Sequence, residues 1–220
     1  MPIRTKICCI RNRNEAEIAI RCHADAIGLV SEMPSGPGVI AEEEISQITR
    51  TLPPTLDTFL LTSKQDAFEI IAQQQRCGTN VIQLVDRQTE ETYLHLRGAL
   101  SGIAIVQVVH VRDESTMEEA LSIAATHKVD ALLLDSGNPD GAVKELGGTG
   151  RLHDWSLSRR IVEGVSPLPV FLAGGLNAEN VASAISEVQP FGVDVCSGVR
   201  TDGQLSEEKL ARFMNAVHLI

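Results

Sequence analysis

Aromatic side chains are scarce in this sequence of 220 residues. Phe, Tyr and Trp together make up 3% of the chain, with one Trp and one Tyr. Hydrophobic residues nevertheless reach 43%, so the core must be built from Ile, Leu, Val and Ala. That share, with 22% charged residues, is typical of globular proteins, and the length predicts a single domain over residues 1–220.

Positive charge is also in short supply. Lys and Arg number 19 against 29 Asp and Glu, which gives a formal net charge of −10 at pH 7. A surface of this sign repels nucleic acid and anionic membranes, so we expect neither as a partner. It does not exclude a small anionic ligand, which needs only a few local donors.

Long apolar runs and paired cysteine motifs are missing as well. No apolar stretch approaches the ~20 residues needed to span a bilayer, and the N-terminus MPIRTKICCI has no signal-peptide core. The five cysteines form no CxxC pair, so neither a zinc site nor a disulfide framework is indicated. The six histidines have no metal-ligand spacing. We therefore expect a cytoplasmic protein with reduced thiols and no metal.

What is present is a repeated alternation of short apolar runs and helix-like segments. The runs predict strands, and several are apolar throughout, as in parallel strands covered on both faces. The expected strands cover residues 6–10, 26–30, 58–61, 81–84, 103–109, 131–135, 169–173 and 192–196. Helical spacing predicts helices over residues 14–24, 64–77, 116–127, 178–188 and 206–217. Asn14 is the expected N-cap of the first helix, and Phe68 lies on the apolar stripe of the second.

This alternation favours a (β/α)8 barrel. Eight units in 220 residues leave about 27 residues for each, near the lower limit of a fold that commonly has ~250 residues. A doubly wound open sheet is the alternative, but no GxGxxG follows the first strand. In a barrel, chemistry is found at the C-terminal ends of the strands. The polar residues that end apolar runs are therefore the candidates.

The stretch KICCIR at residues 6–11 ends the first expected strand with two adjacent cysteines. Side chains alternate along a strand, which predicts that Lys6 and Cys8 share one face and that Cys9 points to the other. Only one thiol would then enter the mouth of the barrel. On the residues alone, both cysteines are most simply small core residues.

Further candidates end the later strands. Asp135 follows three leucines, where a carboxylate either caps a turn or serves a function. GGTG at 147–150 lets the backbone approach a ligand or forms a flexible turn. AGGLN at 173–177 leads into a helix, and SGVR at 197–200 follows the last strand. Loops after strands 7 and 8 often form phosphate sites in barrels, so a phosphate site is expected here.

The order of these motifs resembles the phosphoribosylanthranilate isomerase family of tryptophan biosynthesis. The resemblance rests on KICCI, ADAIGLV, VIQL, LLLD, GGTGRLHDWSL, LAGGLNAENV and GVDVCSGV, and covers nearly the whole chain. It implies a (β/α)8 barrel that isomerises N-(5-phosphoribosyl)anthranilate to 1-(2-carboxyphenylamino)-1-deoxyribulose 5-phosphate by an Amadori rearrangement. It implies no cofactor. A monomer or a homodimer is expected.

The resemblance also implies roles for individual residues. Cys8 matches the family's general base and Asp135 its general acid. The substrate contacts are expected from Lys6, Arg11, Gln83, Asp194 and Arg200. The phosphate is expected to bind at Gly147, Gly148, Thr149, Gly150, Gly174, Gly175, Asn177, Ser197 and Gly198.

Departures from the family pattern leave the substrate open. Cys9 replaces a glycine, and the loop MPSGPGVI at 33–40 lacks the arginine that binds the anthranilate carboxylate. Val85 stands where strand 4 usually has histidine, and Arg200 replaces a glutamate. Either Arg200 or Arg11 compensates, or the chain is a divergent paralogue acting on another phosphorylated sugar amine. A non-catalytic barrel that binds a phosphorylated metabolite is a third reading, and a redox pair of Cys196 with Cys8 is a further hypothesis.

Overall fold

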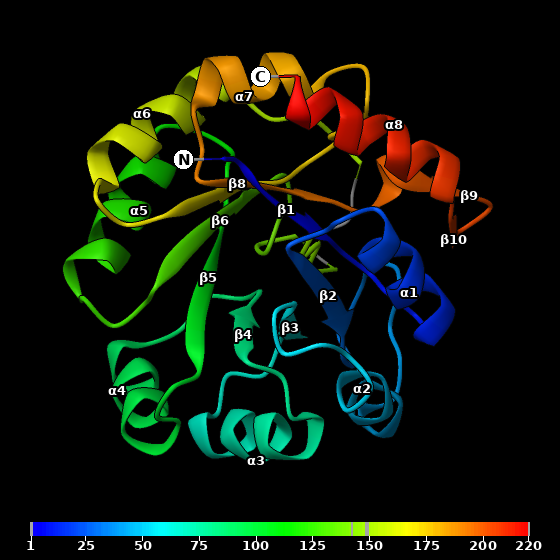
Figure 1. Ribbon diagram of the computed structural model, residues 1–220. Helices are drawn as coiled ribbons and strands as arrows, with labels where there is room; N and C mark the ends of the chain where they lie inside the picture. The colour runs from blue at the N-terminus through cyan, green and yellow to red at the C-terminus, as the bar shows by residue number, and fades with distance from the viewer. Residues whose placement is uncertain (1, 142, 148–149, 220) are drawn as a thin grey trace.

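Eight parallel strands close into a barrel in the computed structural model, which describes residues 2–141, 143–147 and 150–219. Each strand pairs with the next along the chain, and the last pairs with the first (Figure 1). The strands are β1 Arg4–Ile7, β2 Ala26–Val30, β3 Asp57–Thr62, β4 Val81–Leu84, β5 Ala104–His110, β6 Ala131–Asp135, β7 Val170–Leu172 and β8 Gly192–Val195. The predicted (β/α)8 barrel is confirmed, and the open-sheet alternative is excluded.

In the described part of the chain, eight helices surround the barrel (Figure 1). They are α1 Arg13–Arg21, α2 Glu42–Thr49, α3 Ala67–Cys77, α4 Glu90–Ala99, α5 Ser115–Ala125, α6 Trp155–Val165, α7 Val181–Val188 and α8 Glu207–His218. A 3-10 turn, η1 Ser197–Val199, and a small hairpin of β9 Arg200–Thr201 and β10 Gln204–Leu205 lie between β8 and α8. No helix within the described ranges has both the length and the apolarity to cross a membrane.

Two helix predictions need correction. Asn12, not Asn14, caps α1, because its Oδ1 accepts a hydrogen bond from the N–H of Glu15 at 3.0 Å. In α3 the side chain of Phe68 is 70% exposed, whereas Ile70 and Cys77 are fully buried. The helix begins at Ala67, after its cap Asp66. In the helix that starts there, Ile70 and Cys77 face the barrel and Phe68 does not.

The core has two layers, as expected for a barrel whose strands are covered on both sides. A large aliphatic layer lies between the strands and the helices and includes Ile7, Leu60 and Leu132. A smaller cluster fills the barrel and includes Val106, Leu133 and Phe171. Because the barrel is filled with side chains, a ligand can enter only at its ends.

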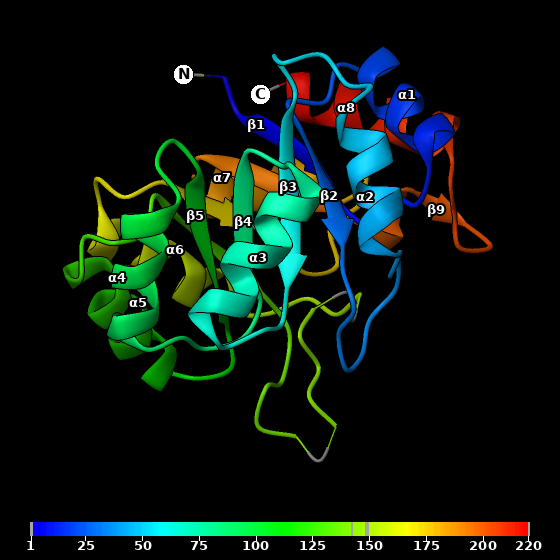
Figure 2. The ribbon, with the colours of Figure 1, turned by 90° about the horizontal axis from the view of Figure 1, so that it is seen from below.

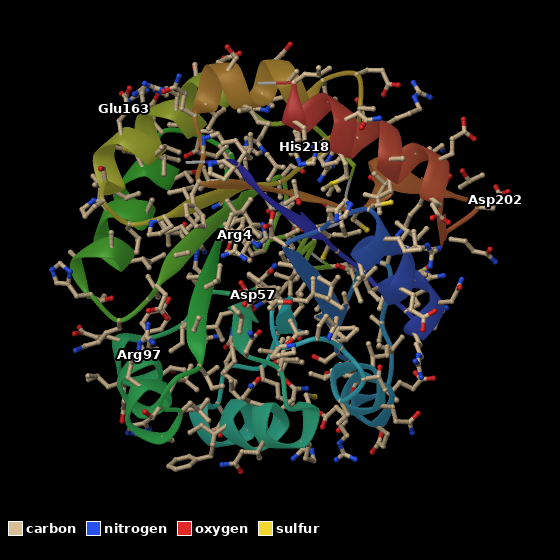
Figure 3. The ribbon with its side chains drawn as sticks, in the orientation of Figure 1. Arg4, Asp57, Arg97, Glu163, Asp202 and His218 are labelled. Carbon is tan, nitrogen blue, oxygen red and sulfur yellow. The ribbon has the colours of Figure 1, made fainter. Side chains whose placement is uncertain are left out.

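The two ends of the barrel differ. At the N-terminal ends of the strands, Arg4 and Asp57 form an ion pair at 2.8 Å near the barrel axis (Figure 3). At the opposite end, the connections after β2 and β6 project together beyond the barrel (Figure 2). The Ser35 hydroxyl of the first connection donates a hydrogen bond to the Lys144 carbonyl of the second. These two loops therefore wall the C-terminal mouth.

Candidate active site

A cavity occupies the C-terminal mouth and encloses about 610 Å³ of space, part of it open to solvent. Strand ends and loops from around the barrel contribute to its wall. The lining residues are Cys8, Cys9, Val30, Met33, Gly36, Pro37, Leu61, Gln83, Asp135, Leu146, Gly147, Gly150, Ala173, Gly174, Gly175, Leu176, Asp194, Cys196 and Ser197. The cavity has the size of small-molecule sites, and most of the predicted site residues border it.

Cys8 lies at the end of β1, where its N–H donates to the Val195 carbonyl at 2.8 Å. Its side chain is 6% exposed and lines the cavity. Gly28 of β2 makes room for it, since a Cβ at that position would lie 2.9 Å from Cys8 Sγ and 3.2 Å from Lys6 Nζ. The thiol and the ammonium group therefore border the same small space.

The prediction that Cys9 points away from the mouth is wrong. Cys9 belongs to the cluster inside the barrel and lines the cavity beside Cys8. The strand ladder ends at Ile7, and Cys9 has a φ of +63°, so the alternation of side chains stops before this residue. Left-handed backbone is uncommon for a residue other than glycine, and the family resemblance has glycine here.

The Cys9 thiol lies between two others. It hydrogen-bonds with the thiols of Cys196 and Cys8, and these bonds together with burial raise its pKa well above the ordinary value. All five cysteines are free thiols. Cys196 and Cys8 were predicted to lie near each other, and Cys9 links them. Because its pKa is raised, the Cys9 thiol stays protonated and donates a hydrogen bond.

Lys6 and Asp194 form a buried ion pair under the cavity floor. Lys6 Nζ lies 2.9 Å from Asp194 Oδ1, and their side chains are 0% and 8% exposed. Burial opposes the charge on Lys6, but Asp194 and then Cys8 overcome it and raise the pKa of the lysine. The Nζ also lies 5.1 Å from the centre of the Phe59 ring. A permanent positive charge therefore lies next to the thiols.

Asp135 ends β6 on another side of the mouth. Its Oδ1 accepts a hydrogen bond from the Ser136 N–H at 2.7 Å. The loop after β6 brings the Gly147 backbone close to this carboxylate, because a Cβ at Gly147 would lie 2.5 Å from Asp135 Oδ2. The glycine has a φ of +122°, so both its conformation and its closeness to the carboxylate exclude a side chain.

The glycine loops after β6, β7 and β8 converge at one edge of the cavity. A Cβ at Gly175 would lie 3.0 Å from the Gly150 carbonyl, and one at Gly150 would lie 3.3 Å from the Ser197 hydroxyl. Gly174, Gly175 and Ser197 line the cavity with Gly150. The loops in which the sequence predicted a phosphate site therefore meet here. Their glycines carry no side chain, so the backbone at this edge is open to a ligand.

Asn177 and Gly198 do not line the cavity. The Asn177 Oδ1 accepts hydrogen bonds from the N–H groups of Glu179 and Asn180, which shapes the turn before α7. That turn explains why α7 begins at Val181, later than predicted. A Cβ at Gly198 would lie 2.0 Å from the Leu176 carbonyl, so this glycine lets two loops pack together. Gly148 and Thr149, also predicted for phosphate, lie outside the described residues.

Gln83 has a polar side-chain atom that is not satisfied, whereas Asp194 is paired with Lys6. Both residues are buried and line the cavity. Gln83 Oε1 has no hydrogen-bond partner within the part of the chain that the structure describes, whereas Asp194 Oδ1 has Lys6 Nζ at 2.9 Å. Buried polar atoms without partners are costly, so a ligand that donates hydrogen bonds would be favoured here.

The two arginines predicted near the substrate lie elsewhere. Arg11 is exposed and does not border the cavity. Arg200 is buried, and its guanidinium forms an ion pair with Glu15 at 2.9 Å. Neither arginine reaches the cavity, so the structure does not support compensation for the missing loop arginine by either residue.

Sequence reasoning missed Gly28 and Glu15. A glycine inside an apolar strand is a signal for a close approach of another group, and AIGLV contains one. Glu15 gave no such signal, because an acidic residue in the first turn of a helix is ordinary. Within the described ranges, no group of three or more His, Cys, Asp and Glu side chains is placed to hold a metal.

Comparison with known proteins identifies the family. The family described as N-(5'phosphoribosyl)anthranilate (PRA) isomerase matches residues 5–216. The chain belongs to this family. It is 36% identical over 217 residues to N-(5'-phosphoribosyl)anthranilate isomerase 2 of Methanosarcina mazei, covering 98% of this chain and 93% of the relative.

Solved structures of the isomerase family share the fold. The phosphoribosyl anthranilate isomerase from Thermotoga maritima superposes with a TM-score of 0.83 at 30% identity, covering 99% of this chain and 100% of the other. Another, in complex with reduced 1-(o-carboxyphenylamino)-1-deoxyribulose 5-phosphate, superposes with a TM-score of 0.79 at 28% identity and the same coverage. The family thus includes a protein whose structure holds a reduced analogue of the expected product.

Proposed function

We propose that this chain isomerises N-(5-phosphoribosyl)anthranilate to 1-(2-carboxyphenylamino)-1-deoxyribulose 5-phosphate, with Cys8 as the general base and Asp135 as the general acid. One observation carries the assignment. Cys8 directly follows β1 and Asp135 ends β6, yet both border one cavity whose rim is formed by the glycine loops. A sugar phosphate anchored at that rim would reach both groups.

The chemistry requires two proton transfers that these residue types can perform. Asp135, as a carboxylic acid, delivers a proton to the furanose ring oxygen, and the ring opens to a Schiff base. The Schiff base makes the proton on C2 acidic, and the Cys8 thiolate removes it. The resulting enolamine gains a proton on C1 as its C2 hydroxyl becomes a carbonyl, so that substrate and product are isomers.

Lys6 supports the base in this proposal. Its ammonium group borders the same space as Cys8 Sγ and is held in place by Asp194. A positive charge close to a thiol favours the thiolate, which is the form that accepts a proton. Lys6 therefore acts on the substrate through Cys8, whereas Gln83 Oε1 and Asp194 Oδ1 accept hydrogen bonds from the hydroxyl groups of the opened sugar.

The phosphate is proposed to bind where Gly150, Gly175 and Ser197 converge. Backbone close to a ligand and a hydroxyl group can supply the donors that a phosphate needs without a lysine or arginine. Ser197 begins η1, and its hydroxyl lies at the same edge of the cavity as both glycines. Asn177 and Gly198 shape these loops rather than contact the ligand.

Substitution of Gly175 by alanine tests the phosphate site. Gly175 has a φ of +65°, and a Cβ there would lie 2.9 Å from the Arg151 carbonyl carbon. The loop must therefore move, and we expect KM to rise about tenfold or more with a smaller change in kcat. Gly78→Ala is the matched control, because Gly78 has a φ of +70° with nothing within 4 Å. Equal kinetic effects of the two substitutions would contradict the phosphate assignment.

A second candidate is an isomerase with a different aglycone. Among the described residues that line the cavity there is no Lys, Arg or His, although the anthranilate group carries a carboxylate. The lining includes apolar residues such as Val30, Met33 and Leu61, against which we place the aglycone. This lining favours a flat apolar ring and provides no charged partner for its carboxylate.

A coupled assay with freshly prepared phosphoribosylanthranilate tests the activity. We expect turnover, and we expect the analogue made from aniline, which lacks the carboxylate, to react with a kcat/KM within about tenfold of it. Complementation of an isomerase-deficient tryptophan auxotroph provides an independent readout. Absence of turnover of both compounds would overturn the isomerase assignment and leave a phosphometabolite-binding barrel.

The remaining proposals concern the setting of the enzyme. We propose a single domain that acts in the cytoplasm on a small phosphorylated substrate, without nucleic acid, membrane or cofactor. The chain is proposed to be a monomer or a homodimer. The family supports this range, since one solved relative is described as monomers generated from the dimeric isomerase of Thermotoga maritima.

A further inference from the structure

We propose that the buried pair of Glu15 and Arg200 is a positioning clamp, which holds the backbone of Cys8 and Cys9 so that the Cys8 thiol faces the cavity. The inference rests on the proposed role of Cys8 as the base. Neither member of the pair lines the cavity. Both are therefore positioning residues, which act on the reaction through Cys8.

Arg200 binds the two carbonyl groups that follow the end of β1. Its Nη2 donates to the Cys8 carbonyl at 3.2 Å and to the Cys9 carbonyl at 2.5 Å. The paired part of β1 ends at Ile7, and the Cys8 N–H still donates to the Val195 carbonyl at 2.8 Å, so Arg200 adds a second hold on this segment through its carbonyl groups. A buried carbonyl requires a partner, and the guanidinium group provides one for each.

Glu15 fixes the guanidinium group from the other side. Its Oε1 lies 2.9 Å from Arg200 Nη1, and its Oε2 lies 3.2 Å from Arg200 Nη2. The same carboxylate accepts hydrogen bonds from the N–H groups of Leu205 and Arg11, both at 3.0 Å. The clamp therefore joins the start of α1, the hairpin after β8 and the end of β1.

The segment that the clamp holds has an unfavourable conformation. Cys9 has a φ of +63°, which a residue with a Cβ adopts only when its surroundings enforce it. Gly38 packs against it so closely that a Cβ at Gly38 would lie 2.5 Å from the Cys9 Cβ. The Cys9 side chain thus has little room, and the contacts of its carbonyl with Arg200 oppose relaxation of the backbone.

The charge of Arg200 also reaches the thiols. Its Nε has no hydrogen-bond partner within the part of the chain that the structure describes. The hydrogen bond from Cys9 and, against burial, the charge of Arg200 lower the pKa of Cys196. The guanidinium group, which does not line the cavity, thus acts on a thiol that does.

The experiment compares Arg200→Met, Arg200→Lys and Glu15→Gln with Arg212→Met, which removes an exposed arginine paired with Glu179. For Arg200→Met and Glu15→Gln, assayed below their melting temperatures, we expect kcat to fall about tenfold or more, with KM changed by less than about threefold. Arg200→Lys keeps the charge but loses the planar fork, so we expect no rescue. Arg212→Met should match the wild type.

Alkylation separates local loosening from unfolding. Iodoacetamide should modify Cys8 about tenfold faster in Arg200→Met, because its backbone is released. Cys77, which is fully buried in the outer layer, should stay unmodified. Trypsin cleaves after Lys6 and Arg11, so peptide 7–11 carries Cys8 and Cys9 for fragmentation by mass spectrometry. Exposure of Cys8 and Cys77 together would indicate global unfolding and contradict the clamp.

Other outcomes also decide the question. A raised KM with unchanged kcat in Arg200→Met would overturn the clamp in favour of a contact with the substrate carboxylate. Unchanged kinetics and unchanged alkylation would show that the Glu15–Arg200 pair does not position Cys8, and would overturn the clamp. If Arg200→Met does not fold, Glu15→Gln, which keeps the side-chain shape, decides by the same readouts. If the wild type has no isomerase activity, the proposed function fails, and alkylation alone still tests the clamp.

Discussion

Cys8→Ala should lower kcat by about 10²- to 10⁴-fold, the contribution typical of a positioned general base. The variant removes the only atom of this side chain that can accept the C2 proton. KM should change little, because the phosphate and the sugar hydroxyls are proposed to bind other residues. Rates measured with phosphoribosylanthranilate under saturating conditions check the prediction.

Folding should survive the substitution. Cys8 is a small side chain at the edge of a cavity, so its truncation enlarges an existing space rather than creating a new void inside the core. Cys8→Ser retains the shape and replaces the thiol with a much weaker acid, so it should be nearly as slow as Cys8→Ala. A serine variant with more than about a tenth of the wild-type kcat would contradict the thiolate mechanism.

The matched control is Cys22→Ala. Cys22 is a free, half-buried thiol at the end of α1, away from the cavity. Its removal should leave kcat and KM unchanged. Cys9→Ala tests the contribution of the neighbouring thiol. It deletes the group that hydrogen-bonds to Cys8 and Cys196 and keeps the proposed base. It should reduce kcat less than Cys8→Ala.

The strands could be predicted well because their signal is local. The runs at 26–30, 81–84 and 131–135 match the observed strands to the residue, since each is largely apolar and nearly all of its residues are buried. The loops could be predicted to converge, because parallel strands bring their C-terminal ends to one side. The resemblance then placed Cys8 and Asp135 at one mouth.

The failures arose where local rules end. The parity rule applied to Cys8 and Cys9 assumed a strand through residue 10, whereas the strand stops at Ile7 and Cys9 turns left-handed. Arg200 looked available for a substrate because nothing in the sequence marks Glu15 as its partner. That contact joins residues 185 positions apart, and no periodicity predicts it.

The orientation of α3 failed for a similar reason. A stripe containing Phe68 satisfies the helical spacing as well as one containing Ile70 does, so the spacing alone cannot distinguish them. The cap at Asp66 sets where the helix begins, and the loop after β3 sets its rotation. The buried residues include Gln73 and Gln74, whose side chains bond to Glu42 and to Thr79. Polar residues with buried partners are not recognisable from hydropathy.

Asp135→Asn should also lower kcat by about 10²- to 10⁴-fold, because the amide cannot donate the proton that opens the furanose ring. The substitution keeps the size of the side chain. An oxygen can still accept the hydrogen bond from the Ser136 N–H, so the turn after β6 should persist. Unchanged thermal stability would show that the loss is chemical.

Asp202→Asn is the control for this change. Asp202 lies in the turn of the β9–β10 hairpin at the edge of the molecule, with a φ of +49° that asparagine tolerates well (Figure 3). Its kinetics should equal those of the wild type. If Asp135→Asn retains more than about a tenth of the wild-type kcat, another group must protonate the ring oxygen.

The double variant Cys8→Ala with Asp135→Asn tests whether the two residues act in separate steps. The acid is proposed to act in ring opening and the base in the later removal of the C2 proton. When two consecutive steps are slowed, the slower one sets the overall rate, so the losses do not multiply. We therefore expect the double variant to be about as slow as the slower single variant. A multiplicative loss would mean that Cys8 and Asp135 act in the same transition state, and the stepwise order proposed here would be wrong.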